Sequence, residues 1–345
     1  MSEQGGKQGR FQYLREGEGV ALLLAVPPLT VAVLAQLLFE ISAYDLVALG
    51  EEVASHLKTM EAPDLAGRLA LADGRVLWTL AVFLHLTAGL GLTGLAVTIL
   101  CRSISLRGLR YFVPIGVVLI VGGVAGFALA AALKSPISGL FSFTYDSLMA
   151  MPGVPASFLV AARIEVVLLN VLSIVAPVSG LMAACSTLAP PRNGVRADLS
   201  FLASQVKSLK ALVVIGSIYM VTGVLHLGVW LRWPGTLVDG DALASQIHDH
   251  AMAMSLYWGG AFSVLIAAFY APAMVALNRR AGAIIAATMK DSTGGLTPRQ
   301  FLEDHGLSLN VSKQLPQIVA VLAPLLAGPI GAAVVDLARV LPGAQ

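Results

Sequence analysis

Long apolar blocks separated by charged connections make up most of this chain. Six of the blocks contain no Asp, Glu, Lys or Arg. Each has about the length that a helix needs to cross roughly 30 Å of hydrocarbon, at about 1.5 Å of rise per residue. The pattern therefore predicts an all-α integral membrane protein, a polytopic bundle of six spanning helices in one membrane domain over residues 1–345. The six blocks are residues 20–39, 76–100, 111–133, 166–188, 211–231 and 251–277.

A seventh uncharged run covers residues 315–335. It contains Pro316, Pro324 and Pro329, and each proline removes a backbone donor that a helix would use. We expect these prolines to break a regular span, although neighbouring helices can satisfy the freed carbonyls inside a membrane. Two alternatives remain open for residues 315–341, a re-entrant or docked hairpin and a seventh span.

The charges between the blocks indicate how the chain is oriented. Most of the 22 lysines and arginines lie in the tail of residues 1–19 and in every second connection after it. The positive-inside rule places such connections in the cytoplasm. We therefore expect a cytoplasmic N-terminus in a plasma membrane, which would be the inner membrane if the source is bacterial. These bases are Lys7, Arg10, Arg15, Arg102, Arg107, Arg110, Arg192, Arg196, Lys207, Lys210, Arg279, Arg280, Lys290, Arg299 and Lys313.

The segment of residues 40–75 should lie on the opposite, extracytoplasmic side. Its apolar residues recur at three- and four-residue steps, which is the pattern of one apolar helix face. We expect a short amphipathic helix that lies on the outer membrane surface or caps the bundle. The face consists of Leu46, Leu49, Val53, Leu57 and Met60.

Two cytoplasmic segments are also predicted to contain helices. In residues 190–210 an apolar face lies beside lysines, which predicts an interfacial helix drawn to anionic lipid. In residues 278–313 a capping box begins at Thr297 and predicts a cytoplasmic helix. The apolar face of the first segment consists of Leu199, Leu202, Val206 and Leu209.

Composition agrees with a lipid environment and narrows the function. Hydrophobic residues make up 57% of the chain, charged residues 12%, and the mean hydropathy is +0.81, whereas a soluble domain has about 25% charged residues. The net charge of +2 provides no concentrated basic face for a nucleic-acid partner. The chain also lacks a P-loop, a nucleophile elbow and a dinucleotide fingerprint, so no specific enzyme class is indicated.

Polar residues in a membrane span are functional candidates because it is costly to leave them there. Arg163, Asn170, Ser173 and Pro177 follow one another at steps of seven, three and four residues and share one helix face. One interpretation is a substrate path beside a helix that Pro177 breaks. The other is ordinary packing, in which Arg163 extends to the membrane surface and Asn170 bonds a neighbouring helix.

Histidines form a second group of candidates. His85 lies in the middle of block 76–100, and His226 shares a face of block 211–231 with Tyr219 and Thr222. Either imidazole could shuttle protons, bind haem iron, or simply bond across helices. His248 precedes block 251–277, so a hairpin could bring it near His226.

That hairpin suggests a possible transition-metal site. Imidazole groups, with Asp241 or Asp249 added, are suitable ligands for such an ion. The candidate ligands are His226, His248 and His250. The last two are only two residues apart, so on a helix they would point in opposite directions.

Two further expectations concern contacts. Lys134 and Glu165 flank the same extracytoplasmic connection and are expected to form an ion pair. Small residues recur every four positions at Gly122, Gly126 and Ala130, which lets membrane helices approach closely, within one chain or in a homo-oligomer. The adjacent pair Gly259 and Gly260 is expected to act in the same way.

Three functional hypotheses follow from these patterns. The leading one is a carrier or channel for a small solute or ion, without a cofactor, in which the Arg163–Pro177 stripe lines the path and both histidines contribute polar contacts or proton coupling. The first alternative is a non-catalytic scaffold, assembly or signalling subunit of a membrane complex, whose polar stripes are packing contacts. The second alternative is a membrane redox subunit that binds haem or a metal.

Overall fold

Helices account for every regular element in the part of the chain that the structure, a computed structural model, describes. The described residues are 19–43, 45–61, 63–191, 199–238, 240–289 and 311–340. In chain order the elements are η2 (Val20–Ala25), α1 (Val26–Ser42), α2 (Leu46–Thr59), α3 (Leu65–Ser103), α4 (Leu106–Ala132), α5 (Pro136–Ala150), α6 (Ala156–Ser186), α7 (Leu199–Arg232), η3 (Trp233–Thr236), α8 (Asp241–Met289) and α10 (Val311–Val340).

Seven candidate membrane spans occur among these helices, judged by length and composition. Six of them correspond to the six predicted blocks, and the seventh is Gln314–Gly331 within α10. This confirms the prediction of a helical membrane bundle. Some helices continue well past the hydrocarbon. The 49 residues of α8 extend over roughly 70 Å at about 1.5 Å per residue.

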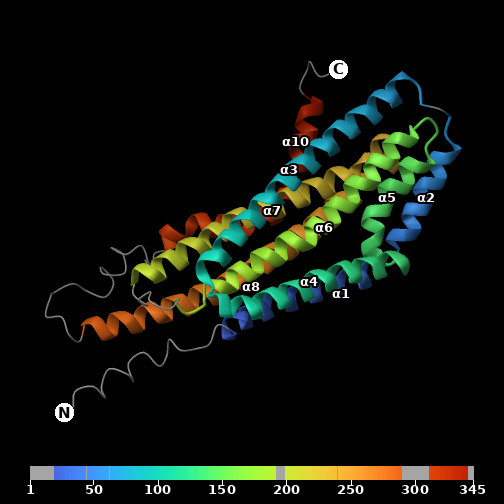
Figure 1. Cartoon of the computed structure of the whole chain (residues 1–345). Helices are drawn as coiled ribbons and strands as arrows, with labels where there is room; N and C mark the ends of the chain where they lie inside the picture. The colour runs from blue at the N-terminus through green and yellow to red at the C-terminus, as the bar shows by residue number, and fades with distance from the viewer. Residues whose placement is uncertain are drawn as a thin grey trace, which may run out of the picture.

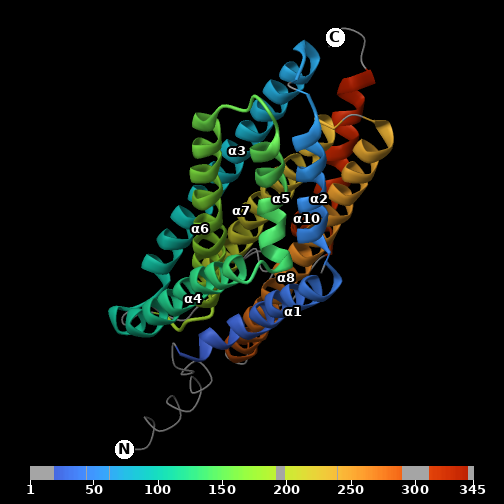
Figure 2. The ribbon, with the colours of Figure 1, turned by 90° about the vertical axis from the view of Figure 1, so that its right-hand side faces the viewer.

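The long helices lie side by side in one bundle (Figure 1). Helix α3 packs against α6 and α7, and α7 and α8 both pack against α10. Helices α1 and α4 are inclined to the long helices, and α2 lies alongside α5 near one end of the bundle (Figure 2). Helix α10 ends at the end of the bundle opposite to η2.

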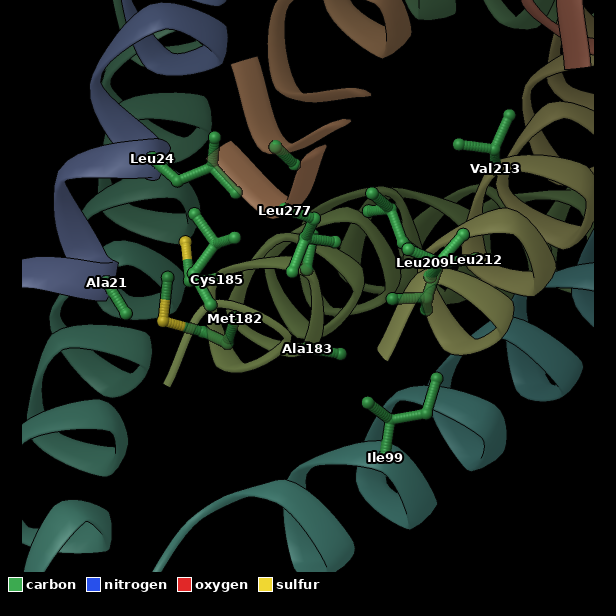
Figure 3. Packing of buried hydrophobic residues seen from close by; sticks show 14 of the residues in the cluster. Ala21, Leu24, Ile99, Met182, Ala183, Cys185, Leu209, Leu212, Val213 and Leu277 are labelled. Carbon is green, nitrogen blue, oxygen red and sulfur yellow. The ribbon is translucent and has the colours of Figure 1, made fainter. Parts of the chain in front are cut away.

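Buried apolar side chains form two cores, one toward each end of the long helices. The first core surrounds the end of α6 nearest η2 and includes Leu24, Cys185 and Leu277 (Figure 3). The second core lies at the other end and includes Trp78 and Trp230. A layer of polar side chains, described below, lies between these two cores.

The expected break of the tail at its prolines does not occur. Helix α10 is continuous over 30 residues with Pro316, Pro324 and Pro329 inside it, which excludes a hairpin. Its neighbour α8 compensates for the local disturbance of the backbone. The Leu325 amide donates to Ser263 Oγ of α8 at 3.2 Å, and the Pro324 carbonyl lies against the Cα of Gly259. Contacts of this kind let prolines persist in membrane helices.

The amphipathic helix expected within residues 40–75 is α2, and it packs on protein. Leu46, Val53 and Leu57 are buried in the second core. Their partner is α5, which the sequence indicated only as a partly helical connection. The two helices approach closely because Gly139 of α5 faces Leu46, where an added Cβ would lie 3.1 Å from Leu46 Cγ. Helices α2 and α5 together therefore cap this end of the bundle.

From Leu199 onward, the helix expected to lie at the membrane interface in residues 190–210 belongs to the bundle instead. Residues from Leu199 onward are the first turns of α7. Their apolar face is buried in the first core rather than turned to lipid, because α7 continues without interruption into the bundle. The buried residues are Leu199, Leu202, Val206 and Leu209. Helix α8 continues to Met289, and the capping box predicted at Thr297 lies outside the described residues.

Candidate functional site

Polar side chains separate the two apolar cores at the middle of the bundle. On α3, His85 lies between Val82 of the second core and Leu92 of the first. On α7, Thr222 and His226 lie between the last first-core residue, Met220, and the first second-core residue, Leu227. On α6, Asn170 lies between Leu169 and Ala176 in the same way. We call His85, Asn170, Thr222 and His226 the polar layer.

His85 is the centre of the contacts between α3 and α7. Its Nδ1 lies 3.2 Å from Thr222 Oγ1. The ring stacks on Tyr219, with centroids 4.5 Å apart and planes at 22°, and on His226, with centroids 5.9 Å apart and planes at 12°. Gly223 permits this approach, since an added Cβ there would lie 3.1 Å from His85 Cε1.

His226 is buried, and its polar requirements are only partly met. Its Nε2 is a buried atom that has no hydrogen-bond partner among the described residues. Most buried polar groups in proteins are hydrogen-bonded, so an exception requires an explanation. A transient ligand, such as a water molecule, a proton or a small polar solute, would provide the missing partner.

Three tryptophans cover the polar layer on the side of the second core. The ring of Trp78 lies 6.4 Å from the ring of His226 and 4.5 Å from that of Trp230. Trp233 lies 6.2 Å from both tryptophan rings. The indole Nε1 groups of Trp78 and Trp233 also lack hydrogen-bond partners in the described structure. The ring nearest His226 is that of Trp78, whereas the Trp233 indole nitrogen lies against Gly74 of α3.

The predicted stripe on α6 is only partly an interior surface. Asn170 is buried in the polar layer, but Arg163 and Ser173 are exposed and Pro177 is half-buried. Each residue turns a helix by about 100°, so Ser173 lies about 60° around the axis from Asn170. Helix α6 also stays continuous through Pro177. Asn170 is therefore the buried member of the stripe, whereas the exposed Ser173 hydrogen-bonds the side chain of Tyr219.

The expected ion pair between Lys134 and Glu165 is wrong. Lys134 Nζ donates to Glu51 Oε1 of α2 at 3.3 Å. The intervening α5 packs against α2 and thus brings Lys134 to that helix instead. On α6, Glu165 interacts electrostatically with Arg75 of α3, whose guanidinium lies 4.6 Å from the Phe158 ring centroid.

The predicted metal site is not assembled. Nowhere in the described residues do three His, Cys, Asp or Glu side chains come together in a way that could hold a metal ion. His226 faces His85 and Trp78, and the ring of His250 lies 6.2 Å from that of Phe143. His248 lies against Gly235 of η3. Because each histidine has a different environment, they provide no common coordination sphere.

Sequence patterns identified most members of this site separately. His85, Asn170 and the α7 stripe of Tyr219, Thr222 and His226 were all candidates, whereas the roles of Trp78 and Trp233 were missed. A useful signal would have been the position of Trp78 seven residues before His85 and of Trp233 seven residues after His226. Comparisons with family models, with curated proteins and with solved structures found no match for this chain.

Proposed function

We propose that this integral membrane protein transports a small polar solute or ion, and that the polar layer is the part of the bundle that the solute passes. The observation that carries the proposal is the buried His226 Nε2, which has no hydrogen-bond partner among the described residues. It lies beside His85, between the two apolar cores of the bundle.

A polar side chain within the hydrocarbon is unfavourable unless a partner satisfies it. If the polar layer served only packing, its donors and acceptors would satisfy one another across the helices. His85 and Thr222 do so at 3.2 Å, but His226 Nε2 and the nearby indole groups do not. Such unused groups are what a passing polar solute would require.

The exposed glycines of α4 indicate a surface for contact between two copies of the chain. Gly122 and Gly126 of α4 face open space, since an added Cβ at either would meet nothing within 4 Å. We propose that this glycine face contacts a second copy of the chain, because small residues let membrane helices approach closely. Cross-linking of single cysteines placed at Gly122 and Gly126 tests the contact between copies. We further propose a plasma membrane location.

Flux measurements on proteoliposomes test the transport function. We expect stopped-flow light scattering to show faster entry of at least one of three probes, urea, glycerol or glycine, than into protein-free vesicles. His85→Leu and Asn170→Leu should each reduce that entry at least tenfold. Thr98→Leu is the control, because Thr98 is an exposed polar residue elsewhere on α3.

Two results would contradict the proposal. One is flux that both polar-layer variants leave unchanged while they fold normally. The other is an absence of flux for all three probes. A stoichiometric partner that co-purifies would then favour the scaffold function.

A further inference from the structure

We propose that the His85–His226 pair binds one proton, and that this proton moves together with the transported solute. The proton site is argued from the geometry of the pair, whereas its coupling to a solute rests on the proposed transport function.

The hydrogen-bond network assigns the tautomer of His85. Thr222 Oγ1 donates its single hydrogen to the Tyr219 carbonyl at 2.8 Å. The same oxygen lies 3.2 Å from His85 Nδ1, and it can only accept there. His85 Nδ1 therefore carries the hydrogen, and in the neutral ring Nε2 keeps its lone pair. The nitrogen of the pair that has no hydrogen-bond partner among the described residues is His226 Nε2, and it accepts the proton.

The second imidazole limits the pair to one proton. The two rings are nearly parallel, with centroids 5.9 Å apart and planes at 12°, and both side chains are buried. Two imidazolium ions this close would repel each other in surroundings with little water. A single bound proton avoids this repulsion, and titration of one ring then depends on the other.

Charged groups on the neighbouring helices interact with partners outside the polar layer. On α6, Glu165 interacts with Arg75 of α3, and Arg163 is exposed. On α5, Asp146 interacts with Lys134 and Glu51. On α7 itself, the titratable neighbour of the pair is Tyr219, whose hydroxyl donates to the Leu172 carbonyl at 3.3 Å.

The remaining helices add no charge to the polar layer in the described structure. On α8, the ring of His250 lies near Phe143, and His248 lies against Gly235. Asp241 and Asp249 are exposed. The Tyr257 hydroxyl donates to the backbone carbonyl of Ala35 in α1. The described side chains of α10 and η3 contain no titratable group. A proton on the pair is therefore an uncompensated positive charge that burial disfavours, so the pair releases it readily, as a carrier that moves a proton requires.

Tryptophan fluorescence of the full-length protein reports on this proton directly. The Trp78 ring lies 6.4 Å from the His226 ring, and a protonated imidazole quenches a nearby indole. We expect a pH-dependent step in fluorescence that His226→Gln abolishes and His85→Gln shifts. His56→Gln should keep the step, because His56 is exposed on α2. Circular dichroism and size-exclusion profiles establish that each variant is folded.

Vesicles with trapped pyranine test the coupling. Entry of urea, glycerol or glycine should change the lumenal pH with the wild-type protein and leave it constant with His226→Gln. Entry of a solute with no change in lumenal pH would overturn the coupling and leave the transport function standing. Absence of entry for every probe would overturn transport and coupling together.

The fluorescence step decides the proton site independently of flux. A step of the same size in His226→Gln, or no step in the wild-type protein, would overturn the site. A solvent deuterium effect on the position of the step provides a second check, because it requires an exchangeable proton.

Discussion

Thr222 shows how one side chain can fix the chemistry of another at the residue scale. Its hydroxyl is bound to the Tyr219 carbonyl within its own helix, which is the usual behaviour of threonine in helices. That local bond leaves only the oxygen lone pairs for His85. The orientation of His85 is therefore set by α7, although the two residues are 137 positions apart.

Asp146 is the residue outside the spans that links stability to pH. Burial raises its pKa above the ordinary value of 3.8, and Glu51 adds to this effect, whereas Ser142 and Lys134 oppose it. The folded state thus binds the proton more tightly than the unfolded chain. The stabilisation is complete below the ordinary pKa and is lost as the pH rises through the raised value.

The substitution Asp146→Asn tests this linkage. We expect the variant to melt at a higher temperature than the wild type at neutral pH, with the difference shrinking as the pH falls toward the ordinary pKa of aspartate. Thermal unfolding in detergent, followed by circular dichroism at several pH values, measures it. Glu52→Gln controls for the loss of one negative charge, because Glu52 is exposed on α2. A difference that is independent of pH would contradict the assignment.

At the element scale, the sequence predicted the helices more reliably than their ends and partners. Uncharged blocks predict spans because lipid excludes charge. The same signal does not show that α7 begins at Leu199, since an apolar face can be covered by lipid or by protein. Lys134 was assigned to Glu165 from proximity in sequence, but packing of α5 on α2 brings it to Glu51 instead. Contacts between helices depend on packing that a single sequence does not contain.

The contact between α8 and α10 explains how a helix with three prolines persists. Two adjacent glycines of α8 have different surroundings there. An added Cβ at Gly259 would collide with the backbone carbonyl of Pro324, whereas one at Gly260 would lie 3.7 Å from the flexible end of Leu325. Backbone atoms cannot move aside as easily as a side chain, so the two positions should respond differently to the same substitution.

We therefore predict opposite effects for Gly259→Ala and Gly260→Ala. The first should destabilise the protein by about 1–3 kcal/mol through overpacking. The second should be neutral or stabilising by up to about 1 kcal/mol, because alanine favours a helix over glycine. Unfolding in detergent with increasing SDS measures both. Equal effects would show that α10 does not pack on this face of α8.

The polar layer is where prediction from sequence reached its limit. His85, Asn170 and His226 are identifiable because polar residues are rare in apolar blocks. Their common depth follows only when the helices are aligned along the bundle, and in that alignment Arg163 and Ser173 are exposed. The missing partner of His226 Nε2 is a property of the assembled fold, which the sequence cannot reveal.

At the scale of the whole molecule, seven candidate spans have a consequence for topology. An odd number of crossings places the two ends of the chain on opposite sides of the membrane. The positive-inside rule puts the N-terminus in the cytoplasm, so the end of α10 should be extracytoplasmic. The opposite positions of η2 and the end of α10 in the bundle agree with this arrangement (Figure 1).

Reporter fusions test this topology at three positions. A reporter at Arg107, in the first turn of α4, should be cytoplasmic, and one at Glu51 of α2 should be extracytoplasmic. A reporter fused after Gln345 should match Glu51, because α10 crosses the membrane once. If it matched Arg107 instead, α10 would not span, and its contacts with α7 and α8 would have to form outside the hydrocarbon. If Arg107 and Glu51 reported the same side, the orientation of the whole bundle would be wrong.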